Sequence, residues 1–265
     1  MPTFETPGPL MLSLRVPAGA ITIETIDGAE TEVEIEPLDR AAEQVIEAVT
    51  VELRGRPGGG HELVVEIEER RFLVFSSAPR VHARIQCPHG ADLDVKTVSA
   101  DLRGVGSLGA AVVKSVSGDV RLPDLAGDAR IKSVSGDVRL SHVEGLVEVQ
   151  TVSGDVSAAA AGGNVAITTV SGDVRVEEAG RSVTTKSVSG DQFVGAVRAG
   201  ATCQSVSGDV YVAVPRGLQV YIDANSRSGD VASELDPAEG DAPQSGDVAE
   251  LRVKTMSGDI RIARA

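Results

Sequence analysis

The heptapeptide KSVSGDV occupies residues 114–120 and returns unchanged at residues 132–138. Close variants begin at Lys96, Gln150, Thr168, Lys186 and Gln204. Together with the two identical copies, these units start every 18 residues from Lys96 to Gln204. A short fixed period is the signature of a repeat protein in which each unit packs against its neighbours. An 18-residue unit has no room for two helices, and Val, Ser and Gly are poor helix formers. The repeat therefore predicts an all-β protein, a β-solenoid or β-roll of 18-residue coils.

Two pairs of apolar residues recur in most units. In the unit from residue 127 to 144 they are Ala129 with Ile131 and Val138 with Leu140. Each pair alternates with polar residues, which is typical of a half-buried strand. We therefore expect two short strands and two corners per coil, with the glycine of Ser-Gly-Asp permitting the bend between them.

A third apolar column lies between the two strands. It consists of Val116, Val134, Val152, Val170, Val188 and Val206. Its parity is opposite to that of the first strand, which predicts a bend or bulge near Ser-Gly-Asp. We expect this column to be buried, so that an aspartate in place of Val152 would unfold or loosen the stack.

The organisation predicted for residues 1–265 is a single β-solenoid domain in three parts. Residues 1–90 form irregular strands that act as a cap, residues 91–231 form regular coils, and residues 232–265 form a loop and the last coil. A cap is expected because an exposed solenoid end would pair with other strands. Strands are expected at 10–16, 20–26, 31–38, 61–68, 71–76 and 81–86, a short helix within 39–53, and loops at 54–60 and 233–249.

The charge balance excludes several classes of partner. The chain carries 39 acidic and 25 basic side chains, for a net charge of -14. This sign argues against nucleic acid and against an anionic membrane surface. No run approaches the roughly 20 apolar residues of a membrane span, and no basic leader precedes an apolar stretch. We expect a soluble cytoplasmic protein, which would reach a cell surface only by non-standard export.

The core is expected to be thin, because the chain has four Phe, two Tyr and no Trp. Val, Ala, Leu and Ile supply most of its apolar side chains, and β-branched residues suit packed strands. Two cysteines, Cys87 and Cys203, make neither a disulfide framework nor a cysteine-rich metal site. We expect both to be small buried apolar groups.

One aspartate per unit forms the sharpest candidate site. The row consists of Asp101, Asp119, Asp137, Asp155, Asp173, Asp191 and Asp209, continued by Asp230 and Asp259. Stacked carboxylates about 5 Å apart repel one another by ~0.8 kcal/mol per pair in water. Turn capping, in which Asp and Ser side chains accept backbone N–H groups, is the main interpretation. The alternative is a row of Ca²⁺ ions, for which Asp119, Asp137, Asp155, Asp173, Asp191 and Asp209 are the metal candidates. The known calcium-binding roll of type GGxGxDxUx has paired glycines, which these units lack.

Enzyme chemistry finds no support in the repeat. The four histidines, at positions 61, 82, 89 and 142, are scattered, and none recurs beside a serine of the repeat. Serine catalysis needs an oriented base. No catalytic residue and no cofactor are therefore predicted.

Three stretches resemble a known bacterial family. They are FETPGPL (4–10) followed by PAGAITI (17–23), the junction CPHGADLDVKTVSADL (87–102), and the SGDV units ending in VKTMSGDIRI (253–262). With these the chain resembles the "putative adhesin" β-strand-repeat family, a domain of unknown function. The resemblance covers nearly the whole chain. It implies a β-solenoid or two-sheet roll and supplies no catalytic residues.

The leading hypothesis is a non-enzymatic structural or interaction protein. It would be a repeat scaffold of adhesin-like architecture that binds an unknown protein partner or associates with itself. One alternative is a Ca²⁺-binding β-roll that uses the aspartate row. Another is a divergent enzyme with a site in the N-terminal third.

Overall fold

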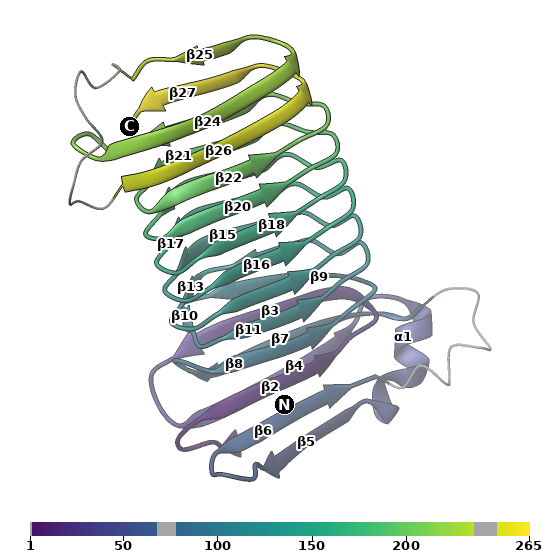
Figure 1. Cartoon of the computed structure of the whole chain (residues 1–265). Coiled ribbons are helices and arrows are strands. Elements are labelled where there is room, and N and C mark those ends of the chain that lie inside the picture. Colours follow the sequence, from purple (N-terminus) through teal and green to yellow (C-terminus); the bar gives the residue numbers. More distant parts are fainter. Residues whose placement is uncertain (1, 68–77, 236–247) are drawn as a thin grey trace. The chain divides into compact units, whose positions relative to one another are not determined.

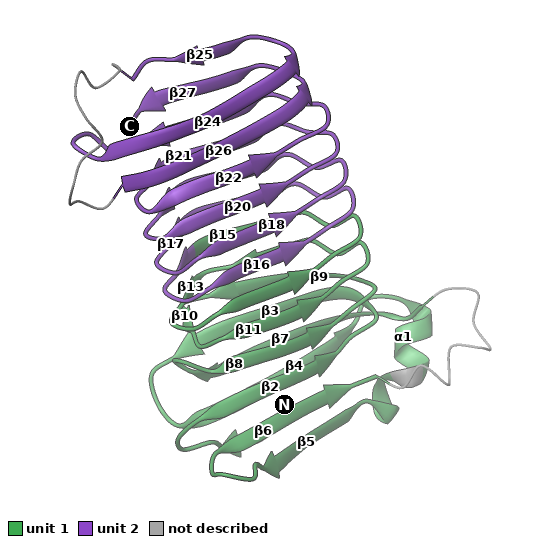
Figure 2. Cartoon of the chain, in the orientation of Figure 1, with its two compact units in different colours: residues 1–141 green, residues 142–265 purple. Residues whose placement is uncertain are grey.

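The computed structural model of the chain describes residues 2–67, 78–235 and 248–265. The strand expected at 71–76 and most of the loop expected at 233–249 lie outside these residues. Two compact units divide the chain, residues 1–141 and residues 142–265 (Figure 2). Each unit stacks coils that contribute one strand to each of two sheets.

The first unit has the less regular strands. Its first sheet runs in the order β1 (Thr3–Glu5), β4 (Glu30–Pro37), β7 (Arg80–Pro88), β3 (Ala18–Ile26), β9 (Ser99–Val105), β12 (Val120–Leu122) and β15 (Val138–Val143). Its second sheet runs in the order β5 (Thr50–Gly55), β6 (His61–Glu66), β2 (Leu10–Arg15), β8 (Asp92–Lys96), β11 (Ala111–Lys114) and β14 (Ala129–Lys132). Two short strands, β10 (Ser107–Leu108) and β13 (Asp124–Leu125), pair with each other.

The second unit is built mostly from regular coils. Its first sheet runs in the order β17 (Val156–Ala161), β19 (Val174–Ala179), β21 (Gln192–Val197), β23 (Val210–Val214), β27 (Ile260–Arg264) and β25 (Val231–Ser233). Its second sheet runs in the order β16 (Val147–Gln150), β18 (Val165–Thr168), β20 (Ser182–Lys186), β22 (Gly200–Gln204), β26 (Val248–Ser257) and β24 (Gln219–Ser228).

The regular coils stack in parallel with a register of 18 residues. Val113 of β11 pairs with Ile131 of β14, and Val147 of β16 pairs with Val165 of β18. Within each unit equivalent residues therefore lie above one another and fill an apolar interior: Val113 and Ile131 in the first unit and Val165 in the second are at most 1% exposed. The predicted all-β solenoid and its two strand columns are confirmed.

Near each end of the sequence, the spatial order of coils departs from the chain order. The coil β2–β3 lies between β6–β7 and β8–β9, because β2 pairs with both β6 and β8 and β3 with both β7 and β9. In the second unit β26 lies between β22 and β24 (Figure 1), and β27 lies between β23 and β25. The coil that comes last in sequence is thus not the outermost one.

Antiparallel strands and a helix close the early part of the first unit. β4 pairs antiparallel with β1 and β7, and β5 pairs antiparallel with β6. The helix expected within residues 39–53 is confirmed as α1 (Arg40–Val45), which a 3₁₀ turn η1 (Ile46–Ala48) extends. Asp39 caps α1, because its Oδ1 accepts the N–H of Ala42 at 2.7 Å. None of the helices in the described residues is long and apolar enough to cross a membrane.

The expected burial of the third apolar column is wrong. Val116, Val134, Val152, Val170, Val188 and Val206 are 43–48% exposed. The residue before each of them points inward instead: Ser115 is 7% exposed and Thr151 is 6% exposed. The physical reason is the turn, whose buried backbone groups need a hydroxyl partner, so the polar residue faces in and the valine faces out.

Both cysteines are free and buried, as expected. Burial raises the pKa of the Cys87 thiol to about 12 and that of the Cys203 thiol to about 11, because the charged thiolate is poorly solvated there. The neighbouring side chain of Thr185 partly opposes this rise in the pKa of Cys203.

We expect the free energy of unfolding to fall as the pH rises from about 9 towards 11. The unfolded thiol ionises near its ordinary pKa of 9.0 while the folded thiol stays neutral, so stability present below pH 9 is lost above it. The slope reaches at most about 1.4 kcal/mol per pH unit for each thiol. Urea unfolding at several pH values measures it, and Cys203→Val should have the shallower slope. An unchanged slope would contradict the burial of this thiol.

Candidate functional site

The aspartate row is held by hydrogen bonds between coils. In the first unit Asp101 Oδ1 accepts the backbone N–H of Asp119 at 3.0 Å, and Asp119 Oδ1 accepts that of Asp137 at 3.1 Å. In the second unit the same bond joins Asp155 to Asp173, Asp173 to Asp191, Asp191 to Asp209, Asp209 to Asp259, and Asp259 to Asp230, at 2.8–2.9 Å. Each of these seven accepting carboxylates therefore caps the turn of a neighbouring coil, which offsets the repulsion along the row.

A buried hydroxyl closes four of the turns from inside. Ser115 Oγ accepts the N–H of Gly118 at 3.0 Å and donates to its carbonyl oxygen. The same contact from hydroxyl to glycine N–H recurs at Ser133, Thr151 and Thr169. From Gly190 onward the turn glycines have positive φ, 128° at Gly190 and 140° at Gly208. The hydroxyls of Ser187 and Ser205 have no hydrogen-bond partner in these turns.

The second carboxylate oxygen distinguishes the two units. In the first unit Arg121 pairs with Asp119 Oδ2 at 2.8 Å, and Arg139 pairs with Asp137 Oδ2 at 3.0 Å. In the second unit the position two residues after Asp191 is Phe193, and that after Asp209 is Tyr211. The sequence thus replaces the neutralising cation by a ring in two successive coils.

These two rings stack on the outer face of the first sheet of the second unit. The centroids of Phe193 and Tyr211 are 5.0 Å apart and their planes differ by 3°. The guanidinium of Arg175 lies 4.2 Å from the Phe193 centroid, and Arg261 pairs with Tyr211 in the strand ladder. A shallow hollow of about 510 Å³ runs along this stack and the neighbouring carboxylates. Both faces of Phe193 are therefore covered, one by Tyr211 and the other by Arg175, so this ring offers only its edge to a ligand.

Cation binding by the row remains a prediction. Among residues 2–67, 78–235 and 248–265, no three His, Cys, Asp or Glu side chains gather closely enough to hold a metal ion. One oxygen of each inner carboxylate is already occupied by a backbone N–H, whereas Ca²⁺ takes six to eight oxygen ligands. We expect 1 mM Ca²⁺ to leave the melting temperature of the EDTA-treated protein unchanged and to give no heat of binding in calorimetry. A rise of several degrees would favour the calcium alternative.

Substitutions of Asp191 separate capping from charge. Asp191→Asn keeps an oxygen that can accept the N–H of Asp209, so we expect a stability within about 0.5 kcal/mol of the parent. Asp191→Ala leaves that N–H without its acceptor and should cost about 1 kcal/mol. Urea unfolding of the three proteins measures this, and equal losses in both variants would show that the charge matters more than the cap.

The exposed valines form a second feature, which we call the valine ridge. In the first unit it consists of Val98, Val116 and Val134, and in the second of Val152, Val170, Val188, Val206 and Met256. Each member is 43–50% exposed, and each lies at the same corner of its coil. An aspartate follows each member by three residues, so the aspartate row flanks the ridge on one side. On the other side, two residues before each member, the chain has Lys96, Lys114 and Lys132 in the first unit and Gln150, Thr168, Lys186, Gln204 and Lys254 in the second.

The structure also joins three residues that the sequence did not connect. Thr25 Oγ1 lies 2.9 Å from His89 Nδ1, and His89 Nε2 lies 3.4 Å from Asp27 Oδ1. This is the order of a hydroxyl, a base and a carboxylate. However, Thr25 is only 9% exposed and its oxygen also accepts the N–H of Ser107 at 3.1 Å. The chain of contacts therefore fastens three loops together, and the buried hydroxyl is poorly placed to meet a substrate.

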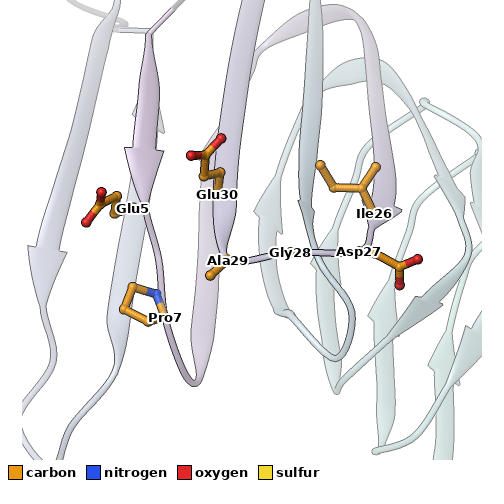
Figure 3. Close-up of a pocket in the computed structure, with 7 residues that line it drawn as sticks. All are labelled: Glu5, Pro7, Ile26, Asp27, Gly28, Ala29 and Glu30. Atoms are coloured by element: carbon orange, nitrogen blue, oxygen red, sulfur yellow. The ribbon is translucent and has the colours of Figure 1, made fainter.

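A hollow of about 390 Å³ lies near these loops (Figure 3). Figure 3 shows Glu5 and Glu30 on neighbouring strands at one side of it, with Asp27 lying apart from both. Glu5 and Glu30 are register partners in the antiparallel pair of β1 and β4. Asp27 lines this hollow, whereas Thr25 and His89 do not, so the hollow reaches the Thr25–His89 contact only through Asp27.

Three comparisons place the chain among known proteins. A search of curated proteins finds no match. Among solved structures, one similar chain is that of a putative cell adhesion protein from Clostridium sporogenes ATCC 15579, at 14% identity over 97% of this chain and 92% of that chain. Its TM-score is 0.24, which carries no argument about fold or function. A family model described as Toastrack DUF4097 matches residues 12–196 and 163–263. The chain therefore belongs to the Toastrack DUF4097 family.

Proposed function

We propose that this protein is a non-enzymatic repeat scaffold that binds a partner protein along its valine ridge. The observation that carries the proposal is the exposure of one valine or methionine in each of eight coils, three in the first unit and five in the second, 43–50% at each position and at equivalent corners. Single exposed apolar residues are ordinary, whereas contiguous exposed apolar rows mark interaction sites.

The stacked coils suit such a role because they hold the ridge in one conformation. The aspartate bonds between coils hold the turns, and at Ser115, Ser133, Thr151 and Thr169 an inward hydroxyl holds the turn from the other side as well. A preorganised surface loses little conformational entropy when it binds. The flanking aspartate row would set the orientation of a partner, since complementary charge contributes more to specificity than to affinity.

A three-residue variant of the second unit tests the proposal. Val152, Val170 and Val188 are changed together to Ser, and the matched control changes Leu38, Val105 and Val112, which are exposed outside the ridge, to Ser. Proteins captured by the immobilised parent are identified, purified and titrated against all three forms by calorimetry. We expect the ridge variant to bind at least tenfold more weakly and the control to bind as the parent does. Equal binding by the ridge variant, with an unchanged melting temperature, would refute the ridge as the binding surface.

A further inference from the structure

The outermost coil of the second unit, β24–β25, has the same strand pairing as an inner coil but only one neighbour. Within the described residues β24 pairs with β26 alone and β25 pairs with β27 alone. In the column that contains Val210 and Ile260, each 1% exposed, Val231 of β25 is 48% exposed. A position that is buried in the inner coils is therefore open at this end.

The second sheet shows the same opening. Val220, Ile222 and Ala224 pair with Ala249, Leu251 and Val253, which are at most 1% exposed. The three residues of β24 are themselves only half-buried. A section of the apolar interior thus reaches the surface, beside a ten-residue strand whose outer backbone groups have no ladder partner among the described residues. Such an edge is a template for another strand.

The first unit ends differently. There β1, β4 and β5 break the parallel stacking with antiparallel pairs. α1 and η1 lie against this region, where Ile46 and Val49 line a surface hollow together with Val33, Ile35 and Val51. Antiparallel strands and a helix are the usual means of closing a solenoid, whereas β24–β25 simply repeats the inner coil.

We propose that the β24–β25 end docks a second copy of this chain, with the two β24 strands antiparallel about Ile222. In that register Ile222 meets Ile222 of the second copy, and Val220 meets Ala224 of the second copy in both directions. The apolar interiors of the two molecules then become continuous. A shift by one residue would place the inward residues of one strand against the outward residues of the other, so the register is well specified.

The charge of this end favours a second copy. The chain as a whole carries -14, and two such molecules repel each other. β24 carries one acidic and one basic residue, Asp223 and Arg227, and β25 carries none. The same outermost coil also carries Asp230 and Glu234, next to β25. Asp223 pairs with Lys254 at 3.3 Å and Glu234 pairs with Arg261, so Arg227 and Asp230 leave this end with no net charge. It is a surface on which two acidic molecules can approach one another.

Symmetry limits the product to a dimer. A strand that pairs with its own copy uses the same patch on both molecules, which gives a closed two-fold interface. The antiparallel strands and α1 of the first unit do not offer the matching parallel coil. Self-association is one of the two modes that the sequence predicts for the scaffold, and this inference gives it a surface. That surface is separate from the valine ridge, so the dimer and the ridge proposal can each fail alone.

Light scattering on a sizing column, from about 1 µM to 1 mM, tests the proposal. We expect the mass to rise from 27.3 kDa towards twice that value and no further. Ile222→Lys and Val231→Lys, tested separately, should raise the concentration of half-dimerisation at least tenfold. Val112→Lys, an exposed valine on β11 of the first unit, is the matched control and should dimerise as the parent does.

Hydrogen exchange identifies the surface independently. Alternate amides of β24 should exchange slowly in concentrated protein and quickly after dilution, while those of β26 stay protected throughout. A constant mass of 27.3 kDa up to 1 mM would overturn the proposal. So would a dimer that Ile222→Lys and Val231→Lys leave intact, or β24 amides whose protection does not depend on concentration.

Discussion

Gly136→Ala is expected to lower the free energy of unfolding by about 3 kcal/mol or more, because the coils stack too closely for a methyl group. A Cβ at residue 136 would lie 2.1 Å from the carbonyl oxygen of Gly118 and 2.7 Å from its carbonyl carbon. Both contacts are to the backbone of the neighbouring coil, which cannot move without breaking its own ladder. Gly136 does not have positive φ, so the cost arises from this contact and not from its own dihedrals.

Gly55→Ala is the matched control. No atom lies within 4 Å of the Cβ that it adds, and Gly55 also lacks positive φ. We expect its stability to equal that of the parent within about 0.5 kcal/mol. Differential scanning calorimetry should show a drop of about 6–12 °C in Tm for Gly136→Ala alone. Equal melting of both variants would mean that neighbouring coils lie farther apart than in this structure.

Val149→Asp should prevent folding, whereas Val152→Asp in the same coil should cost less than about 1 kcal/mol. Val149 is fully buried and pairs with Ile167, so an aspartate there would be an unpaired charge in the apolar interior. Val152 is 45% exposed, and an aspartate there remains hydrated. Circular dichroism and urea unfolding of the two variants measure the difference.

The two substitutions have the same chemistry and differ by three positions, so each is a control for the other. Val170→Asp, one coil further, repeats the exposed case at 43% exposure. A large loss of stability in Val152→Asp would show that the ridge packs against something that the monomer alone does not contain. A folded Val149→Asp would contradict the register of the second sheet.

These valines show where the sequence could and could not predict the fold. Alternation identified the strand columns that contain Ile131 and Val138, because a straight strand sends successive side chains to opposite faces. At the corner the chain turns, and hydrophobicity no longer indicates direction. Thr151 faces inward because Gly154 needs its hydroxyl, and Val152 faces outward as a consequence. The polar residue is buried and the apolar one exposed, the reverse of the usual rule.

The spatial order of the coils could not be predicted from the sequence either. Every coil presents the same apolar columns to its neighbours, so any two coils fit and pattern alone gives no preference. The positions of β2–β3 and β26–β27 inside their units depend on the connections between coils.

The aspartate row could be predicted as a capping device, but not as one that caps the neighbouring coil. The stacked rings were missed, although Phe193 and Tyr211 are 18 residues apart and so had to lie side by side.

The position of β26–β27 between two other coils has a mechanical consequence. If the last coil were the outermost one, tension applied through residue 265 would break its single ladder in each sheet one hydrogen bond after another. Here β26 is bonded to β22 on one side and to β24 on the other, and β27 to β23 and β25. Pulling β26–β27 out of the stack must therefore break two ladders in each sheet at the same time. We expect this segment to resist a larger force than an outermost coil would.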